Sequence, residues 1–231
     1  MRVVACLQAR LGSERLPGKV VREINGLPLI VHIWRRLLAC EEVDQVAVAW
    51  GGKADAVPSV LNEWAMFCAP WWPEEDLLRR HLQAGYQYHA DAIVRVTADC
   101  LFHDPALIDQ LVRSFKNDWP RSRGVSNWPY RRHSEGVDAE VWSMELLAEL
   151  DRTKECPREG FAAWVCNDPT RSVYYQMTLG MQGEKNDGEP HLSIDTPEDL
   201  ALAEKMLAIL GKDRFDYAAT MEAYNSVMAE E

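Results

Sequence analysis

A stretch near the N-terminus decides how the rest of the chain is interpreted, and it reads Gln8-Ala9-Arg10-Leu11-Gly12-Ser13-Glu14-Arg15-Leu16-Pro17-Gly18-Lys19. It follows an apolar run, residues 3–7, which predicts a buried strand. The stretch combines two glycines and a proline with three cations, Arg10, Arg15 and Lys19. A loop at the carboxyl end of a first strand lies where open α/β sheets bind ligands. Its glycines let backbone N–H groups turn toward an anion, and its cations can neutralise a polyphosphate.

Two familiar phosphate-binding motifs do not describe this stretch. A Walker P-loop needs four residues before its Gly-Lys and then Ser or Thr, whereas five residues separate Gly12 from Gly18 and Val20 follows Lys19. The dinucleotide fingerprint G-x-G-x-x-G is also missing from the sequence. The plain alternative is a solvated basic turn between a strand and a helix, since charge runs usually face water.

Composition narrows the classes of protein to consider. The chain has 231 residues, 47% of them hydrophobic and 26% charged, which suits one soluble domain over residues 1–231. A net charge of −11 argues against nucleic-acid or anionic-membrane partners, so the basic stretch favours a small anionic ligand. Six cysteines without C-x-x-C spacing predict no zinc or redox motif. With no apolar run of signal-peptide or membrane length, we expect a cytoplasmic location.

Strand-like and helix-like segments alternate after the first loop. Predicted strands cover residues 43–50, 66–69 and 91–96, and predicted helices cover residues 28–38, 56–65 and 74–88. This alternation predicts an α/β fold with a single-domain, open, mainly parallel (Rossmann-like) sheet sandwiched by helices.

The second half of the chain carries two strong signals for helix starts. Asp104-Pro105 is a cap followed by a first-position proline, and Thr196-Pro197-Glu198-Asp199 fits a capping box. Residues 137–142 and 172–179 predict strands, and residues 184–189 predict a surface loop. No repeat or interdomain linker interrupts the pattern.

Two isolated aspartates stand at predicted element ends. Asp99 follows the strand at 91–96, and Asp195 precedes the helix that starts at Pro197. Mg²⁺ is usually held by one or two carboxylates together with phosphates and waters, so both are candidate ligands. The alternative is that each is a turn or cap residue.

A fourth segment, residues 127–141, combines charges with an alternating pattern. Asp138 and Glu140 alternate with apolar residues, so both would project from one face of a strand, where they could orient acceptor hydroxyls, an amine or a second metal. A solvated strand face is the alternative. Three neighbouring side chains would suit an anionic acceptor, or are surface charge: Arg131, Arg132 and His133.

Three motifs in order resemble one family. The first stretch matches the pattern Q-A-R-x-G-S-x-R-L-P-G-K of the cytidylyltransferases that activate acidic sugars, the CMP-acylneuraminate and CMP-Kdo synthetases, nearest their spore-coat-polysaccharide-type branch. The R-x-T-A-D-C at 95–100 and the I-D-T-P-E-D-L at 194–200 are similar to the second and third signatures. The resemblance implies a fold of the nucleotide-diphospho-sugar transferase type and CTP as substrate, with its triphosphate gripped by Arg10, Ser13, Arg15 and Lys19.

The resemblance also implies roles for particular residues. Arg10, Arg15 and Lys19 would be catalytic, and Asp99 and Asp195 would bind Mg²⁺. Nucleotide binding is assigned to Gln8, Ala9, Arg10, Gly12, Ser13, Arg15, Lys19 and Thr97. Acceptor binding, in a subregion of about residues 117–180, is assigned to Asn127, Arg131, His133, Asp138 and Glu140. Family members are commonly dimers, so a homodimer is possible.

Three departures from the family pattern fall where an acceptor would be recognised. Trp71-Trp72-Pro73 replaces Gly-Ser before Glu74-Glu75-Asp76, Gly160 replaces a frequent His after Arg158-Glu159, and Leu101 replaces a proline. The triphosphate loop and the two aspartates are untouched. Acceptor identity is therefore the open question.

These observations predict a Mg²⁺-dependent cytidylyltransferase that transfers CMP from CTP to an anionic acceptor (an acidic sugar, phosphate or phosphonate) and releases pyrophosphate. One alternative is a sugar-phosphate nucleotidyltransferase that uses UTP or GTP, and another is a non-catalytic nucleotide-binding protein. A glycosyltransferase would need a D-x-D metal motif, and the nearest sequence is Asp138-x-Glu140.

Overall fold

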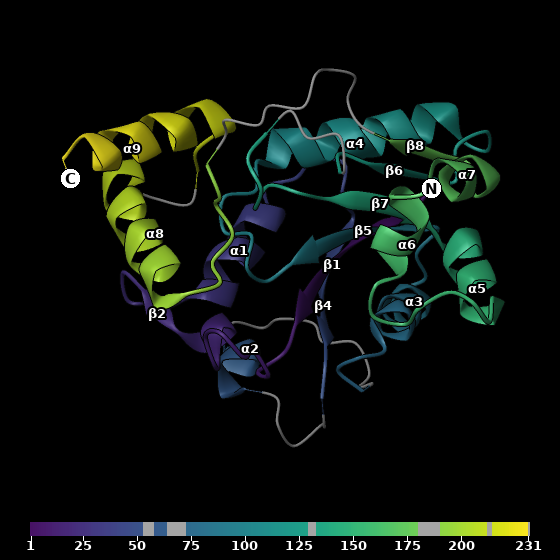
Figure 1. The fold of residues 1–231 in the computed structure, drawn as a ribbon, viewed down its shortest axis with the longest axis horizontal. Coiled ribbons are helices and arrows are strands. Elements are labelled where there is room, and N and C mark those ends of the chain that lie inside the picture. The colour runs from purple at the N-terminus through teal and green to yellow at the C-terminus, as the bar shows by residue number, and fades with distance from the viewer. Residues whose placement is uncertain (53–57, 64–72, 129–132, 180–189, 212–213, 231) are drawn as a thin grey trace.

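A six-stranded sheet forms the centre of the computed structural model, which describes residues 1–52, 58–63, 73–128, 133–179, 190–211 and 214–230 (Figure 1). The strand order is β4-β1-β5-β7-β6-β8. Strand β7 is antiparallel to β5 and β6, and the other adjacent pairs are parallel, so the predicted mainly parallel α/β sheet is confirmed. The strand bounds are β1 Val3–Ala9, β4 Gln45–Trp50, β5 Ala92–Thr97, β6 Gly124–Ser126, β7 Glu140–Ser143 and β8 Met177–Leu179, with a small hairpin of β2 Glu23–Ile24 and β3 Leu27–Pro28.

Helices cover both faces of this sheet. Their bounds are η1 (a 3₁₀ turn) Lys19–Val21, α1 Leu29–Leu37, α2 Ser59–Glu63, α3 Leu77–Gln87, α4 Pro105–Asp118, α5 Met144–Arg152, α6 Phe161–Cys166, α7 Pro169–Tyr174, α8 Pro197–Leu210 and α9 Tyr217–Ala229. The two predicted helix starts are confirmed: Asp104 accepts from the Ala106 N–H, and Thr196 and Asp199 form the capping box.

The hydrophobic core is split into two clusters by the sheet. Alternate residues of β1 point to opposite faces, so Leu7 packs in the cluster with α1, α4, α8 and α9, while Cys6 packs with α3, α5 and α6. Figure 1 shows α8 and α9 at the left, well apart from α5 and α7 at the right. Because β1 and β5 are parallel neighbours, the sheet holds their carboxyl ends side by side.

Two sequence predictions in the second half of the chain need correction. Ser172 to Tyr174 lie in helix α7, so the predicted strand at 172–179 is wrong over these residues and right only for β8. The Asp168 carboxylate caps that helix by accepting from Thr170 N at 2.8 Å, with Pro169 at the first helical position. Strand β7 begins at Glu140, so Asp138 precedes the strand that was predicted to contain it. The predicted strand at 66–69 and loop at 184–189 lie outside the described residues.

Within the described segments, no helix combines the length and the apolar character that crossing a bilayer requires.

Candidate active site

The loop after β1 folds back on itself through its own backbone. Ser13 N and Gly18 N both donate to Leu11 O, at 2.9 and 3.1 Å, and the Ser13 hydroxyl accepts from Leu16 N at 3.3 Å. Gly18 has φ +67°, a left-handed conformation that glycine adopts without steric cost. This turn places Lys19 at the first position of η1.

Lys19 joins the two candidate metal ligands. Its Nζ donates to Asp99 Oδ2 at 2.9 Å, to Asp195 Oδ1 at 3.0 Å and to Ile194 O at 3.0 Å. Asp99 follows β5, and Asp195 precedes α8, where the Asp199 carboxylate of the capping box accepts from its N–H at 2.9 Å. Three segments that are distant in the sequence therefore converge on one ammonium group.

The local electrostatics keep the side chains of Lys19 and Asp99 charged. Burial favours the neutral amine of Lys19, but the Asp99 and Asp195 carboxylates outweigh it and raise the pKa of Lys19 above its usual value. Burial also opposes ionisation of Asp99, yet the Lys19 charge and the hydrogen bonds around the carboxylate hold the pKa of Asp99 below its usual value. A Lys19 cation beside an Asp99 carboxylate is thus the state at neutral pH.

Two more cations lie around this centre. Arg15 is largely exposed and its Nη2 lies 3.0 Å from Asp195 Oδ2. Arg10 lies 3.5 Å from Glu159. His191, which sequence reasoning did not identify, has Nε2 at 3.7 Å from the same Asp195 oxygen. The only sequence signal for His191 is its place four residues before Asp195, and the segment before α8 brings the two side chains together.

A cavity of about 380 Å³ opens over this loop. Its lining contains every residue assigned to the nucleotide from the sequence except Gly12. A Cβ at Gly12 would lie 2.4 Å from a Glu74 carboxylate oxygen, so a larger residue there would displace the end of the Glu74 side chain. We call this space the nucleotide cavity after the ligand that the sequence predicts for it; it is lined by Gln8, Ala9, Arg10, Ser13, Glu14, Arg15, Lys19, Val20, Thr97, Ala98, Asp99 and Asp195.

A second cavity of about 340 Å³ adjoins the first, and we call it the acceptor cavity because Asp138 and Glu140, which the sequence analysis assigns to an acceptor, line it. The two share four lining residues, Arg15, Thr97, Asp99 and Asp195. The remaining lining residues are Arg95, Cys100, Trp128, Glu135, Asp138, Glu140, Glu159, Gly160, Ala162, Ala163 and Ser193. Asp99 and Asp195 therefore stand at the junction of the two spaces, and Lys19 bonds to both of them from the side of the nucleotide cavity.

The residues assigned to the acceptor separate into groups. Asp138 and Glu140 line the acceptor cavity. Asn127 is buried instead: its amide donates to Val137 O at 3.1 Å and accepts from Ala139 N at 2.9 Å, which fixes the segment that carries Asp138.

His133 also lies apart from the described cavity lining, with its ring edge-on to Tyr217 at 4.7 Å between centroids. Arg131 and Arg132 lie outside the described residues, so their predicted part in acceptor binding stays a prediction.

An ion pair between neighbouring strands lines the acceptor cavity. Arg95 Nη1 on β5 lies 2.9 and 2.7 Å from the two carboxylate oxygens of Glu140 on β7, and Arg95 Nε donates to Gln8 Oε1 at 3.2 Å. Burial disfavours the guanidinium, but Glu140 outweighs it and raises the pKa of Arg95. This pair locks a cation of the cavity onto the protein's own carboxylate.

The donor set of the site suits Mg²⁺ in part. Asp99 and Asp195 each bring an oxygen within 3.0 Å of the same Nζ, so their carboxylates converge, and both line the nucleotide cavity. Mg²⁺ prefers hard oxygen ligands and completes its shell with phosphates and waters. Across the described residues no group of three or more His, Cys, Asp or Glu forms a complete metal site. The pair therefore fits a metal that arrives with a nucleotide.

Arg80, on α3, is a buried arginine that the sequence did not single out. Its guanidinium donates to Ala9 O at 2.8 Å and to Ala49 O at 2.6 Å, which ties together the carboxyl ends of β1 and β4. A Cβ at Gly51 would lie 2.7 Å from its Cζ. Burial lowers the pKa of Arg80 to about 10. Arg80 thus supports the backbone at the end of β1, where the loop that contains Lys19 starts.

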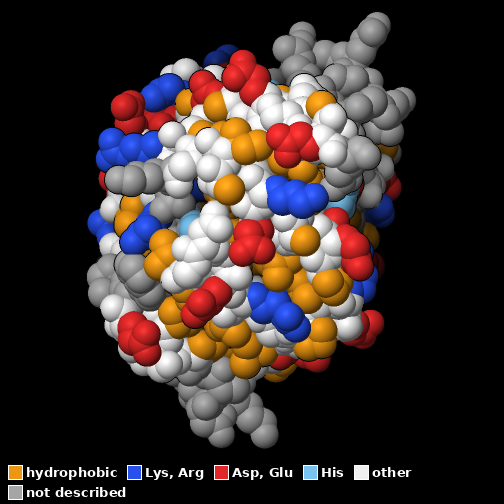
Figure 2. Space-filling view, turned by 90° about the vertical axis from the view of Figure 1, so that its left-hand side faces the viewer, with side chains coloured by type: hydrophobic (Ala, Val, Ile, Leu, Met, Phe, Trp, Pro, Cys, Tyr) orange, Lys and Arg blue, Asp and Glu red, His pale blue; other side chains and the backbone are white. Residues whose placement is uncertain are grey.

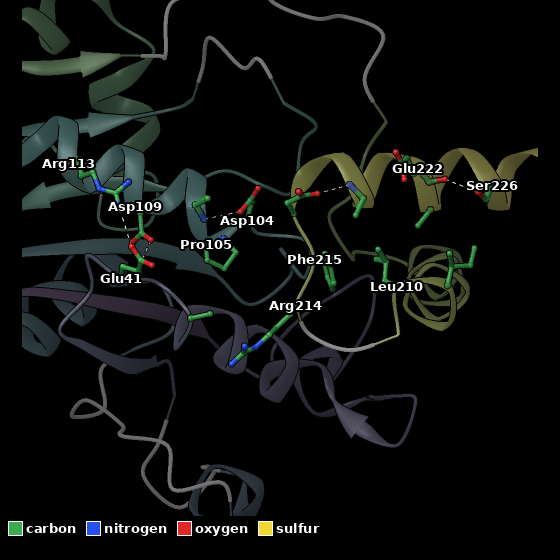
Figure 3. Close-up of a pocket in the computed structure, with 16 residues that line it drawn as sticks. Glu41, Asp104, Pro105, Asp109, Arg113, Leu210, Arg214, Phe215, Glu222 and Ser226 are labelled. Atoms are coloured by element: carbon green, nitrogen blue, oxygen red, sulfur yellow. Dashed lines mark hydrogen bonds and ion pairs between the residues drawn. The ribbon is translucent and has the colours of Figure 1, made fainter.

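A larger cavity, about 950 Å³, lies away from this chemistry, between the end of α1, the start of α4, and α8 and α9 (Figure 3). The two buried carboxylates in its described lining accept hydrogen bonds from backbone N–H groups. Asp109 accepts from Glu41 N at 3.0 Å, and Asp104 accepts from Tyr217 N at 2.9 Å. Figure 2 shows the nearby outer face, where hydrophobic side chains lie among scattered charges. Size alone therefore does not locate the site.

Comparison with known proteins agrees with the three sequence motifs. Residues 4–222 match the cytidylyltransferase family. The 3-deoxy-manno-octulosonate cytidylyltransferase of Chromohalobacter salexigens is 32% identical over 117 residues, 50% of this chain and 46% of that protein, so the match spans about half of that relative. The spore coat polysaccharide biosynthesis protein SpsF of Bacillus subtilis is 26% identical over 207 residues, 85% of this chain and 82% of that protein.

Solved structures agree as well. The structure of a cytidylyltransferase from Leptospira borgpetersenii serovar Hardjo-bovis (strain JB197) matches with a TM-score of 0.89 and 25% identity, and the match covers 99% of this chain and 96% of that one. The predicted resemblance is thereby confirmed at the level of sequence and fold. The chain belongs to the cytidylyltransferase family.

Proposed function

We propose that this chain is a Mg²⁺-dependent cytidylyltransferase that transfers CMP from CTP to a small anionic acceptor and releases pyrophosphate. The observation that carries the proposal is the position of Lys19 between Asp99 and Asp195, which stand at the junction of the nucleotide and acceptor cavities. A group at this junction lies beside the atoms that react when a nucleotide fills one cavity and an acceptor the other.

The reaction is a displacement at phosphorus. An acceptor oxygen forms a bond to the α-phosphorus of CTP, the bond from that phosphorus to the bridging oxygen of the β-phosphate breaks, and pyrophosphate leaves with the electron pair. A phosphate or phosphonate oxygen attacks as the anion, whereas a sugar hydroxyl gives up its proton to water. Such transfers need positioning and charge neutralisation more than covalent help from the protein. Arg10, Arg15 and Lys19 supply positive charge along the nucleotide cavity. Because Lys19 is held by two carboxylates, its charge is preorganised for the transition state.

Asp99 and Asp195 are the residues that would hold Mg²⁺, and the metal would supply further neutralisation of phosphate charge. The backbone of the loop at 10–18 and the Ser13 hydroxyl would orient the phosphates. Asp138 and Glu140 face the neighbouring space in which the acceptor would bind. A homodimer and a cytoplasmic location stay predictions and are part of this proposal.

Pyrophosphate release is the measurement that tests this proposal. The protein is mixed with Mg²⁺, one of CTP, UTP or GTP, and a panel of acidic sugars, sugar phosphates and phosphonates. Pyrophosphate release with CTP and an acceptor, but not with UTP or GTP, supports the proposal. Pyrophosphate release with UTP or GTP instead of CTP favours the sugar-phosphate alternative. If calorimetry shows that the protein binds CTP but no acceptor leads to pyrophosphate release, the non-catalytic alternative is favoured. Failure to bind CTP contradicts the proposal altogether.

A further inference from the structure

The carboxylates of Asp99 and Asp195 already have donors from the chain on each of their oxygens. Asp195 Oδ1 accepts from Lys19 Nζ at 3.0 Å, and Asp195 Oδ2 lies 3.0 Å from Arg15 Nη2. Asp99 Oδ2 accepts from Lys19 Nζ at 2.9 Å, and Asp99 Oδ1 accepts from Cys100 Sγ at 3.4 Å. The atoms that would hold Mg²⁺ are therefore engaged by the protein itself.

Lys19 uses its ammonium group fully in this arrangement. An ammonium has three N–H donors, and three oxygens accept from Nζ at 2.9 to 3.0 Å: Asp99 Oδ2, Asp195 Oδ1 and Ile194 O. The side chain of Lys19 is 12% exposed, and those of Asp195 and Asp99 are 15% and 28% exposed. Partly buried charges of this kind are screened less than surface charges, so Lys19 is an internal counter-ion for both carboxylates.

A divalent cation would compete with this ammonium for the same carboxylate oxygens. A metal bound to Asp99 and Asp195 would bring its charge close to Nζ, and like charges at short range oppose each other's binding. Without the ammonium, the two carboxylates would be a pair of neighbouring anions, which favours a metal. The contacts of Lys19 thus weaken the binding of a free metal ion.

A nucleotide offers Lys19 another anionic partner. Lys19 lines the nucleotide cavity together with Arg10, Ser13 and Arg15, so phosphates in this space would lie beside its ammonium. A lysine ammonium is a compact charge with three rotatable donors on a flexible stem, so it can exchange a carboxylate for a phosphate with a short movement. Its charge would stay beside the phosphates while the carboxylates lose a competitor of the metal.

We infer that Lys19 closes the Asp99–Asp195 pair to free divalent cations and opens it when nucleotide phosphates engage its ammonium. The inference rests on the proposed function and adds an order of binding to it: the metal binds with the nucleotide or after it, and not before it. The nucleotide and the metal then strengthen each other's binding by the same factor, because the coupling between two ligands is reciprocal.

Binding of Mn²⁺ to the protein without a nucleotide tests this inference and needs no turnover. Mn²⁺ takes the same hard oxygen ligands as Mg²⁺, and electron paramagnetic resonance follows the loss of its free-ion signal. We expect Lys19→Met to bind Mn²⁺ at least about tenfold more tightly than the wild-type protein, because the competing charge is removed. Mn²⁺ should also raise the Tm of this variant more than that of the wild type. Adding Asp99→Asn to Lys19→Met should abolish both gains.

Arg15→Met is the matched control, since it removes one positive charge from Asp195 and leaves Lys19 in place. The Arg15 side chain is 67% exposed, so its charge is well screened and its removal should tighten Mn²⁺ binding by less than about fivefold. Lys19→Gln, which keeps a donor without the charge, should behave like Lys19→Met and separates the effect of the charge from a folding defect of one variant. Circular dichroism checks the fold of each.

Three outcomes would overturn the inference. They are wild-type Mn²⁺ binding as tight as that of both Lys19 variants, a gain that survives Asp99→Asn, and an equal gain in Arg15→Met. None of them touches the proposed function, which is tested by CTP binding and pyrophosphate release with the wild-type protein. Failure of the wild type to bind CTP in the presence of Mg²⁺ would instead show that the proposed function has failed.

Discussion

The two adjoining cavities differ in how the chain builds them. Most of the nucleotide cavity comes from one continuous stretch, Gln8 to Val20, with Asp99 and Asp195 added from elsewhere. The described lining of the acceptor cavity is assembled from short pieces of six segments, around Arg15, Arg95, Trp128, Asp138, Gly160 and Ser193. A site built by one stretch leaves a motif in the sequence, whereas a site assembled from distant pieces does not. This difference explains why the sequence indicates a nucleotide more clearly than an acceptor.

The cavities also differ in what their cations do. In the nucleotide cavity, Lys19 is held by two carboxylates that themselves face the ligand space. In the acceptor cavity, Arg95 is locked onto Glu140, which is only 4% exposed, and ties two strands together. We therefore expect substitutions of the first group to reduce catalysis and substitutions of the second to reduce stability. The following predictions test that division.

The largest effect is expected for Lys19→Ala. Removal of a preorganised charge beside the reacting phosphate should lower kcat by about 10²- to 10³-fold. The KM for the acceptor should change little, because Lys19 lies in the lining of the nucleotide cavity and not in that of the acceptor cavity. Steady-state pyrophosphate release checks both values.

Lys154→Ala, an exposed lysine outside both cavities, is the control for loss of one positive charge. A Lys19→Ala enzyme with a near-wild-type kcat would contradict the role given to this residue. Circular dichroism should show the same secondary structure in both variants.

Glu140→Gln should mainly reduce the stability of the protein. The change leaves the Arg95 guanidinium without its carboxylate, and loss of one partner of a buried ion pair costs about 3 kcal/mol or more in free energy of unfolding. Urea unfolding measures this loss. The double variant Arg95→Met/Glu140→Met removes both charges and should recover most of it.

If Glu140→Gln keeps full stability but loses turnover, the division between a catalytic and a structural ion pair is wrong. A raised KM for the acceptor with an unchanged KM for CTP would agree with its position in the acceptor cavity.

Local signals made much of the fold predictable. The cap at Asp104, the capping box at Thr196 and the left-handed Gly18 depend on neighbours a few residues away, and the structure contains all three. The error at Ser172 had a local signal too, since Asp168-Pro169 is the same kind of helix start as Asp104-Pro105. The apolar and β-branched residues of this segment favour a strand, but the helix start at Asp168-Pro169 overrides them as far as Tyr174.

Convergence in space was not predictable from residue types alone. The meeting of Lys19 with Asp99 and Asp195 was implied only by the resemblance of motifs, because hydrogen bonds across 80 and 176 positions leave no local pattern. Arg80 was missed because arginine is rarely fully buried, and nothing in its neighbourhood indicates three carbonyl acceptors. His191 was missed although it stands only four positions before Asp195, because a lone histidine in an irregular segment carries no motif.

Buried histidines on the two faces of the sheet give a pH test. Burial, with the charges of Arg95 and Arg80 nearby, lowers the pKa of His81 to about 3. Burial and the Arg36 charge, against a smaller opposing effect of Asp99, lower the pKa of His103 to about 3. The unfolded chain binds these protons near pH 6.5 and the folded chain does not, so stability is full above about pH 6.5 and falls as the pH decreases.

At pH 5 each histidine should cost about 2 kcal/mol of unfolding free energy relative to pH 7. Urea unfolding between pH 5 and 7 measures this dependence above the range in which most carboxylates titrate. His81→Leu and His103→Leu should each remove about half of the slope. An unchanged slope in either variant would mean that folding does not lower the pKa of that histidine.

The smallest effects are expected at two glycines, one beside each cavity. Gly51→Ala places a Cβ 2.7 Å from the Cζ of the fully buried Arg80, which cannot withdraw without releasing Ala9 O and Ala49 O. We expect a loss of about 1 to 2 kcal/mol of stability and a raised KM for CTP, because the start of the nucleotide loop shifts. Gly160→Ala is the matched control: its Cβ would meet only Pro157 Cγ, at 3.9 Å, and the backbone has φ −91°.

Gly160→Ala should therefore stay within about 0.5 kcal/mol of the parent protein in unfolding free energy and keep the KM for CTP. Any change should appear in the KM for the acceptor, because Gly160 lines that cavity. Equal losses of stability in both variants would show that the two cavities are equally packed. An effect of Gly160→Ala on CTP would show that they are not separate binding spaces. The expected contrast, a tight support behind the nucleotide and open space beside the acceptor, would place the freedom for changing substrates on the acceptor side.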